Sequence, residues 1–394
     1  MTLELNRLTR AVQEMGQTLA HQQKDFNQWV ERARAWLAEF ADRGPTLREA
    51  APEVGAAIPT DEPLDAVIPL PPLPERFTVI GADGTQIGPD RHGAALYYLI
   101  NVGSLVYRHG SGQTPEARSL PDLRYREEDL YEGKLLVQGN LLDVRRDRAE
   151  IEHLADRVEA ESPGQTPLPN PTLALVDGTL LLWVLENLSA EVKERNVRGY
   201  LRQLDRIRRK GAAVAAFTSR PRYTEVGRLL HLARFGEDRT RAEAEPNPLE
   251  RVPDQAIFSF LPPGARSALF TSPRAINRTY YQAGGQEIRF FYINVAREGE
   301  EPVIARVEVP AWVAGDPGET PLLALAHGGV VAQSRIAGGF PYVLARADEL
   351  AYISGPERER LEEMVETALL AAGLRPALSP KAYYKSLTRQ GRRW

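Results

Sequence analysis

Two copies of one short phrase place acidic side chains where they could bind a metal ion. Residues 77–85 read FTVIGADGT and residues 172–179 read TLALVDGT, so each apolar run ends in Asp-Gly, at Asp83 and Asp177. Such a run is typical of a buried strand, and glycine lets the backbone turn after it. Two of these strands side by side would hold two carboxylates together, which is unfavourable unless a cation lies between them. We therefore predict a divalent-metal site at Asp83 and Asp177.

The composition limits which chemistry such a site could use. The chain has 394 residues, 43% hydrophobic and 26% charged, with a net charge of −4, which are ordinary values for a globular protein. It contains no cysteine, which excludes disulfides, thiolate metal sites and cysteine nucleophiles, and its six histidines are widely spaced. Any metal is therefore expected to be a hard, oxygen-bound ion. No apolar run approaches the ~18 residues of a membrane span, and the N-terminus lacks the apolar core of a signal peptide, so we expect a cytoplasmic protein without a membrane partner.

The chain divides into three predicted parts. Residues 1–44 contain an amphipathic helix, expected over 3–42, whose apolar residues recur in steps of three and four from Leu5 to Phe40. This heptad seam favours pairing with another chain, and packing on the body of the protein is the alternative. Residues 45–75 are rich in proline and are predicted to be an extended linker. The remaining residues, 76–394, form the main domain.

The order of elements in the main domain predicts an α/β fold. We expect strands at 76–83, 93–100 and 101–108, a turn-rich region at 109–122, a helix at 140–161, a strand at 172–177, a helix at 186–210, a strand at 212–217 and a helix at 223–233. Residues 236–255 are expected to be a surface excursion, residues 288–296 and 303–309 a hairpin, and helices to follow at 319–336, 342–353, 356–373 and 380–390. Three antiparallel strands followed by alternating helices and strands is the order of a ribonuclease H-like mixed sheet flanked by helices, here with a C-terminal helical extension. In that architecture the ends of the strands carrying Asp83 and Asp177 lie next to each other.

The helix at 140–161 supplies further candidate ligands. A two-metal nuclease needs three or four carboxylates around two ions, one of which activates water while the other stabilises the leaving oxygen. The helix contains five acidic residues: Asp143, Asp147, Glu150, Glu152 and Asp156. Its apolar residues do not define one face clearly, so Glu150 and Glu152 remain equal candidates on spacing alone.

Several segments together resemble the NurA nuclease family. They are the two Asp-Gly strands, the arginine-rich helix around Ala149-Glu150, and the late segments FFY at 290–292, ARVEVPAW at 305–312 and GFPYVLARAD at 339–348. The resemblance spans residues 76–390. It implies a manganese-dependent nuclease, acting as a 5'–3' exonuclease, an endonuclease or both on single- and double-stranded DNA. It also implies a homodimer that works with the HerA-type hexameric ATPase in resecting double-strand breaks.

The resemblance also assigns site residues. It places catalytic, metal-binding carboxylates at Asp83, Glu150 and Asp177, which decides between Glu150 and Glu152, and a fourth at Asp348. Many archaeal members have histidine at this fourth position, so the chain departs from the family there. Two ions, Mn²⁺ or Mg²⁺, are implied.

Basic residues suggest where DNA would bind. After Glu366 the chain has no acidic residue, and we predict that Lys381, Lys385 and Tyr384 contact DNA, together with Arg146 on the 140–161 helix. Further basic candidates, ranked lower because arginine is common on helix surfaces, are Arg145, Arg206, Arg208, Arg209 and Lys210.

Two other functions remain in competition with catalysis. The first is a non-catalytic adaptor or clamp for a DNA motor on the same fold, which the missing histidine favours. The second is a phosphotransferase, which is disfavoured because no glycine-rich phosphate loop is present.

Overall fold

The computed structural model describes residues 8–315 and 321–374, with only the backbone of residues 17–22. The chain folds into two compact units, each made of two segments. Unit 1 comprises residues 1–72 and 217–314, and unit 2 comprises residues 73–216 and 315–394. The predicted boundaries at residues 44 and 75 stay a prediction. No helix in the described part of the chain is long and apolar enough to cross a membrane.

Unit 2 contains the predicted ribonuclease H-like sheet. Its strands are β2 (Phe77–Ile87), β3 (Tyr98–His109), β4 (Glu116–Arg124), β7 (Thr172–Asp177) and the first residues of β8 (Ala213–Ser219), in the order β8-β7-β2-β3-β4. β2, β3 and β4 are antiparallel neighbours, and β7 runs parallel to β2. A small hairpin is formed by β5 (Tyr131–Glu132) and β6 (Leu135–Leu136). The fold class predicted from the order of elements is confirmed.

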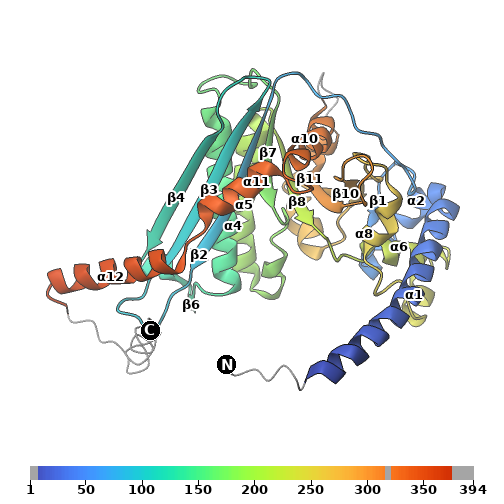
Figure 1. Cartoon of the computed structure of the whole chain (residues 1–394), viewed down its shortest axis with the longest axis horizontal. Helices are drawn as coiled ribbons and strands as arrows, with labels where there is room; N and C mark the ends of the chain where they lie inside the picture. The colour runs from blue at the N-terminus through green and yellow to red at the C-terminus, as the bar shows by residue number, and fades with distance from the viewer. Residues whose placement is uncertain (1–7, 316–320, 375–394) are drawn as a thin grey trace. The chain divides into compact units, whose positions relative to one another are not determined.

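Helices cover both faces of the unit 2 sheet (Figure 1). α11 (Tyr342–Ala351) packs on β2 and β3 from one side, whereas α4 (Asn140–Ala160) packs on β2 and β7 and on α5 (Ala190–Arg209) from the other. The other helices of the unit are α3 (Glu127–Leu130), η4 (Trp183–Asn187), α10 (Leu322–Ile336) and α12 (Gly355–Ala371). The predicted helix at 380–390 lies outside the described residues.

The second and third strands differ from their prediction. We expected separate strands at 93–100 and 101–108, but β3 is one strand over 98–109, and β4 occupies part of the region expected to be turns. β4 escaped detection because it is an edge strand whose residues are mostly exposed and polar, so no apolar alternation marks it. Gly103 does not break a strand; it makes room for α11.

Gly103 lets the backbone of α11 lie directly on the sheet. A Cβ on Gly103 would lie 2.1 Å from the carbonyl oxygen of Ala347 and 2.6 Å from the amide nitrogen of Ala351. The ends of α11 are also held by side chains. Asn101 Nδ2 donates to the carbonyls of Leu350 and Ala351, and Gln333 Oε1 accepts from the N–H of Val343. These contacts fix α11 at both ends, and α11 carries Asp348.

Unit 1 contains a second set of strands and the N-terminal helix. Strands β1 (Ile58–Pro59), β9 (Phe270–Thr271), β10 (Ile288–Asn294) and β11 (Ile304–Pro310) pair antiparallel in this order, so the predicted hairpin at 288–296 and 303–309 is present. Its longer helices are α1 (Thr9–Glu39), α6 (Glu225–Ala233) and α7 (Arg239–Ala244), and its short ones are η2 (Ala41–Arg43), α2 (Gly44–Leu47), η3 (Ala51–Val54), α8 (Asp254–Ile257), η5 (Phe258–Phe260), η6 (Asn277–Tyr281) and α9 (Ala311–Ala314).

The proline-rich segment of unit 1 is packed. Leu47, Ala51, Ala56 and Leu64 have no exposed surface and belong to the core cluster that also contains α6 residues. The prolines limit this segment to short helical turns and extended stretches, but its small and apolar residues still reach the core. The expected surface excursion at 236–255 likewise includes α7 and buries Leu249 and Val252.

We predict that Gly103→Ala destabilises unit 2. A methyl group there would collide with the α11 backbone, which cannot move as a side-chain end can, so the free energy of unfolding should fall by about 2 kcal/mol or more. Thermal or urea unfolding measures this effect. The control is Gly355→Ala, where a Cβ meets nothing within 4 Å. Equal stability of both variants and the wild type would contradict the close packing of α11.

Candidate metal centre

The register of β2 and β7 brings Asp83 and Asp177 together. The last pair in the parallel ladder is Ala82 with Val176, so Asp83 and Asp177 are the next residues on the two strands. In adjacent strands, residues at matching positions point to the same face of the sheet. Asp83 also lies opposite Gly103 on β3, and Gly103 faces α11. The two carboxylates therefore lie on the face that α11 covers.

Asp348 approaches these two carboxylates from α11. It follows Ala347, which lies against Gly103, and the side chain is exposed. Its charge acts on both Asp83 and Asp177. The neighbouring Glu349 forms an ion pair with Arg346. Of these two adjacent acids, Asp348 is the one that lies near the centre.

Glu150 approaches the centre from α4, on the other face of the sheet, where it fills the space left by Gly84 and lies close enough for the charges of Asp83 and Asp177 to act on it. A Cβ on Gly84 would lie 2.6 Å from Glu150 Oε1, so any larger residue would displace the carboxylate. The Glu150 residue is 6% exposed, whereas Glu152 is exposed. At 100° per residue the two point to opposite sides of α4. Burial thus favours Glu150, the residue that the family resemblance indicated.

The crowded carboxylates retain protons more strongly than usual. Burial first, and then the charges of Asp177 and Asp348, raise the pKa of Asp83 to about 6, although the Gly84 N–H donates to its Oδ1 at 2.8 Å. Asp177 lies at the exposed end of β7, but its carboxylate is partly enclosed. This enclosure, followed by the charge of Asp348, raises its pKa. Burial and the nearby Asp147, Asp83 and Asp177 raise the pKa of Glu150 well above its usual value. The centre thus has an unfavourable excess of negative charge.

Arg146 provides the compensating positive charge. Its Nη2 donates to Asp147 Oδ1 at 3.0 Å, and its Nε lies 3.0 Å from Glu150 Oε1. The second contact is an ion pair without hydrogen-bond geometry, which leaves Glu150 Oε1 buried and without a hydrogen bond. The predicted DNA-binding residue Arg146 therefore lies among the carboxylates. The other three, Lys381, Tyr384 and Lys385, lie outside the described residues.

A pocket of about 340 Å³ opens beside the centre. It is lined by Asp177, Glu150, Asp147, Asp143 and Arg146, with Trp183 and Tyr200 among its other lining residues. Asp143 accepts a hydrogen bond of 2.6 Å from Gln86 on β2. Sequence analysis did not select Asp143 or Asp147. Asp143, Asp147 and Glu150 follow one another in steps of four and three residues. This spacing predicts that all three lie on one face of the helix and that Glu152 lies on another, so the sequence contained enough information to choose Glu150.

The donor set fits a hard divalent ion. Asp83, Asp177, Asp348 and Glu150 offer only carboxylate oxygens, one of which is buried without a hydrogen bond, and a dication would offset their repulsion. In the described part of the chain, however, no group of three or more Asp, Glu or His side chains is already close enough together to hold a metal ion.

Carboxylates at the strand ends of a ribonuclease H-like sheet indicate a nuclease, the class that comparison with protein families supports. The NurA domain family matches residues 77–353, which include all four carboxylates. The chain belongs to the NurA family of nucleases. No curated protein sequence matches it significantly.

Solved structures give more distant similarities. The NurA nuclease from Sulfolobus solfataricus aligns at 15% identity over 90% of this chain and 98% of that chain, with a TM-score of 0.44. The catalytic domain of human Endonuclease V aligns at 14% identity over 73% of this chain and 83% of that chain, with a TM-score of 0.32. The family assignment rests on the domain match.

We predict that Asp83→Asn stabilises the metal-free protein at neutral pH. Because the folded-state pKa of about 6 exceeds the ordinary value of 3.8, ionising Asp83 opposes folding; the penalty grows between pH 4 and 6 and is complete above pH 6. Allowing for solvent screening, the gain at pH 7.5 should be about 1–2 kcal/mol, and it should vanish near pH 4.

Thermal unfolding in EDTA across this pH range tests the prediction. Glu152→Gln, an exposed change on the far side of α4, is the control and should not alter the pH profile. If Asp83→Asn unfolds at the wild-type temperature at every pH, ionised Asp83 does not destabilise the fold through burial and nearby like charges as described.

Proposed function

We propose that this protein is a metal-dependent DNA nuclease whose centre consists of Asp83, Glu150, Asp177 and Asp348. The proposal covers 5'–3' exonuclease action, endonuclease action or both, on single- and double-stranded DNA. Its main support is the meeting of carboxylates from β2, β7, α4 and α11 beside an open pocket. Four elements distant in sequence are held together there at an electrostatic cost, which is typical of a functional site.

The side chains divide the work of phosphodiester cleavage. Two bound ions, Mn²⁺ or Mg²⁺, would activate a water and offset the charge that develops on the phosphoryl oxygens. Asp83 and Asp177 would offer carboxylate oxygens to the ions at fixed positions, because both residues belong to paired strands. Glu150 would add a buried carboxylate oxygen from α4. Arg146 lies close enough to these ligands for its guanidinium to orient a phosphate that enters the pocket.

We predict that Asp83→Asn and Asp177→Asn each lower DNA cleavage by at least about 100-fold, because several kcal/mol of charge stabilisation is lost. End-labelled linear DNA incubated with the purified variant and Mn²⁺ measures this loss. Glu152→Gln should cleave at the wild-type rate.

Wild-type activity in either Asp variant would rule out the assigned centre. If the wild-type protein binds Mn²⁺ but cleaves neither single- nor double-stranded DNA, alone or with its motor, the non-catalytic adaptor is the better account.

The proposal includes two protein partners, a second copy of the chain and a HerA-type hexameric ATPase. Support for the second copy comes from α1. Its C-terminal half is packed on unit 1 through Val30, Ala33 and Leu37. In its N-terminal half, Val12 and Met15 are each 55% exposed and continue the seam. Leu5 and the side chain of Leu19 lie outside the described residues.

We predict that Val12→Glu with Met15→Glu weakens self-association, because charges would replace apolar groups at the seam. Light scattering after size exclusion gives the solution mass, which should shift toward the monomer. Gln13→Glu with Gln23→Glu places the same charges at other exposed positions of α1 and should leave the mass unchanged. An unaltered dimer in the seam variant would show that α1 does not pair.

A further inference from the structure

The outer face of α5 carries a straight row of arginines. Arg195, Arg198, Arg202, Arg206 and Arg209 follow one another in steps of three or four residues. At 100° per residue they lie within an arc of about 80°, and at 1.5 Å per residue the row is about 21 Å long. We call these five residues the α5 arginine row. None of these five arginines belongs to the carboxylate centre.

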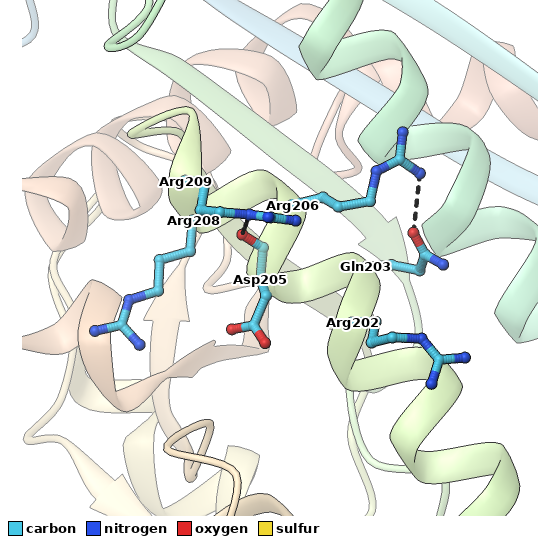
Figure 2. Close-up of a pocket in the computed structure, with 6 residues that line it drawn as sticks. All are labelled: Arg202, Gln203, Asp205, Arg206, Arg208 and Arg209. Atoms are coloured by element: carbon cyan, nitrogen blue, oxygen red, sulfur yellow. Dashed lines mark hydrogen bonds between the residues drawn. The ribbon is translucent and has the colours of Figure 1, made fainter.

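The row borders two adjoining hollows in the surface. One, of about 790 Å³, is lined by six α5 residues, and Arg202 and Arg206 extend to the same side of the helix (Figure 2). The six are Arg202, Gln203, Asp205, Arg206, Arg208 and Arg209. The other, of about 390 Å³, is lined by Arg195, Arg198, Arg202, Glu191 and Glu194. Arg202 lines both, so the row forms one continuous basic border.

The acidic residues that face the row neutralise it only in part. Arg195 and Arg198 form exposed ion pairs with Glu191 and Glu194, and such pairs are worth at most about 1 kcal/mol. Arg195 also lies 3.8 Å from the buried Glu132, and Asp205 lines the larger hollow beside Arg202 and Arg206. Arg206 is held by Glu159 and Asp156 of α4 at 2.6 Å. Within the described residues Arg202 has no carboxylate partner, and Arg209 donates to a backbone carbonyl, that of Asp205.

Further positive charge lies beneath the row. Arg148 of α4 lies under Gly199, where a Cβ would be 2.9 Å from Arg148 Nη2. Besides burial, the charges of Arg145 and Arg202 lower the pKa of Arg148. Arginines crowded together in this way create a positive potential that favours the binding of a polyanion over additional ion pairs with single surface carboxylates.

The position of α5 connects the row to the carboxylate centre. Tyr200 lies on the opposite side of α5 from the row and lines the pocket with Asp177 and Glu150. The row is therefore separated from the pocket by one helix diameter, about 10 Å. A DNA molecule with one phosphate in the pocket continues beyond it, and each strand carries one phosphate per roughly 3.4 Å of helix axis. A row of about 21 Å can face about six of them.

We propose that the α5 arginine row binds the phosphate backbone of the DNA substrate outside the cleavage point. This inference rests on the proposed function, since it takes DNA as the substrate. Guanidinium groups suit the role because each can donate two hydrogen bonds to one phosphate. The contact is independent of base sequence and sensitive to salt.

The test compares two charge-matched double variants of the full chain. Arg198→Gln with Arg202→Gln removes one arginine paired with a glutamate four residues away and one without a carboxylate partner. Arg358→Gln with Arg360→Gln does the same on α12, where Arg358 pairs with Glu362. DNA binding is followed by fluorescence anisotropy in EDTA, with a 30-base-pair duplex over a range of salt concentrations.

Loss of two phosphate contacts should reduce the slope of log affinity against log salt by about two for the α5 variant, and weaken binding by about tenfold near 0.1 M salt. The α12 variant should bind as the wild type does. Equal slopes and affinities for both variants would overturn the inference.

Cleavage of a short oligonucleotide, measured with Mn²⁺, separates this inference from the proposed function. The α5 variant should cleave a dinucleotide at the wild-type rate, since a substrate with a single phosphodiester is too short to span the roughly 10 Å between pocket and row. A reduced rate would mean that α5 acts on the pocket itself and would overturn the inference. If the wild type cleaves no DNA while the slopes still differ, the nuclease proposal fails and the binding surface stands.

Discussion

The burial of several carboxylates close together is the constraint on which unit 2 depends. Asp83, Glu150 and Asp177 each have a raised pKa, and partial or complete burial is the first cause in every case. An arrangement of this kind lowers stability unless a cation balances it. Arg146 does so in part, with two contacts at 3.0 Å. Divalent ions would do so more completely, and they would also supply the chemistry expected of a nuclease.

The rest of unit 2 holds these side chains in place against their repulsion. Strand pairing sets Asp83 beside Asp177, Gly84 leaves space for Glu150, and Gly103 lets α11 bring Asp348 close. Asn101 and Gln333 hold the two ends of α11 through hydrogen bonds to its backbone. Rigid strands and a helix fixed at both ends are more precise supports than loops would be.

Each part of the fold could be predicted where a physical pattern in the sequence marks it. The two Asp-Gly strands were recognisable because buried strands are apolar throughout and glycine ends them. β4 was missed because an exposed edge strand lacks that pattern. The role of Gly103 could not be predicted because it depends on α11, about 240 residues further along the chain. We chose Glu150 over Glu152 from the family resemblance. The spacing of Asp143, Asp147 and Glu150 along the helix would have led to the same choice. The packing of residues 47–64 depends on tertiary contacts that composition does not reveal.

The most direct test of this account is to locate a metal ion in crystals soaked in Mn²⁺, using anomalous scattering at the manganese edge. The account predicts a peak between the carboxylates of Asp83 and Asp177, within coordination distance of Glu150 or Asp348. An empty map at this position, from crystals of protein that degrades DNA in the same Mn²⁺ solution, would contradict it.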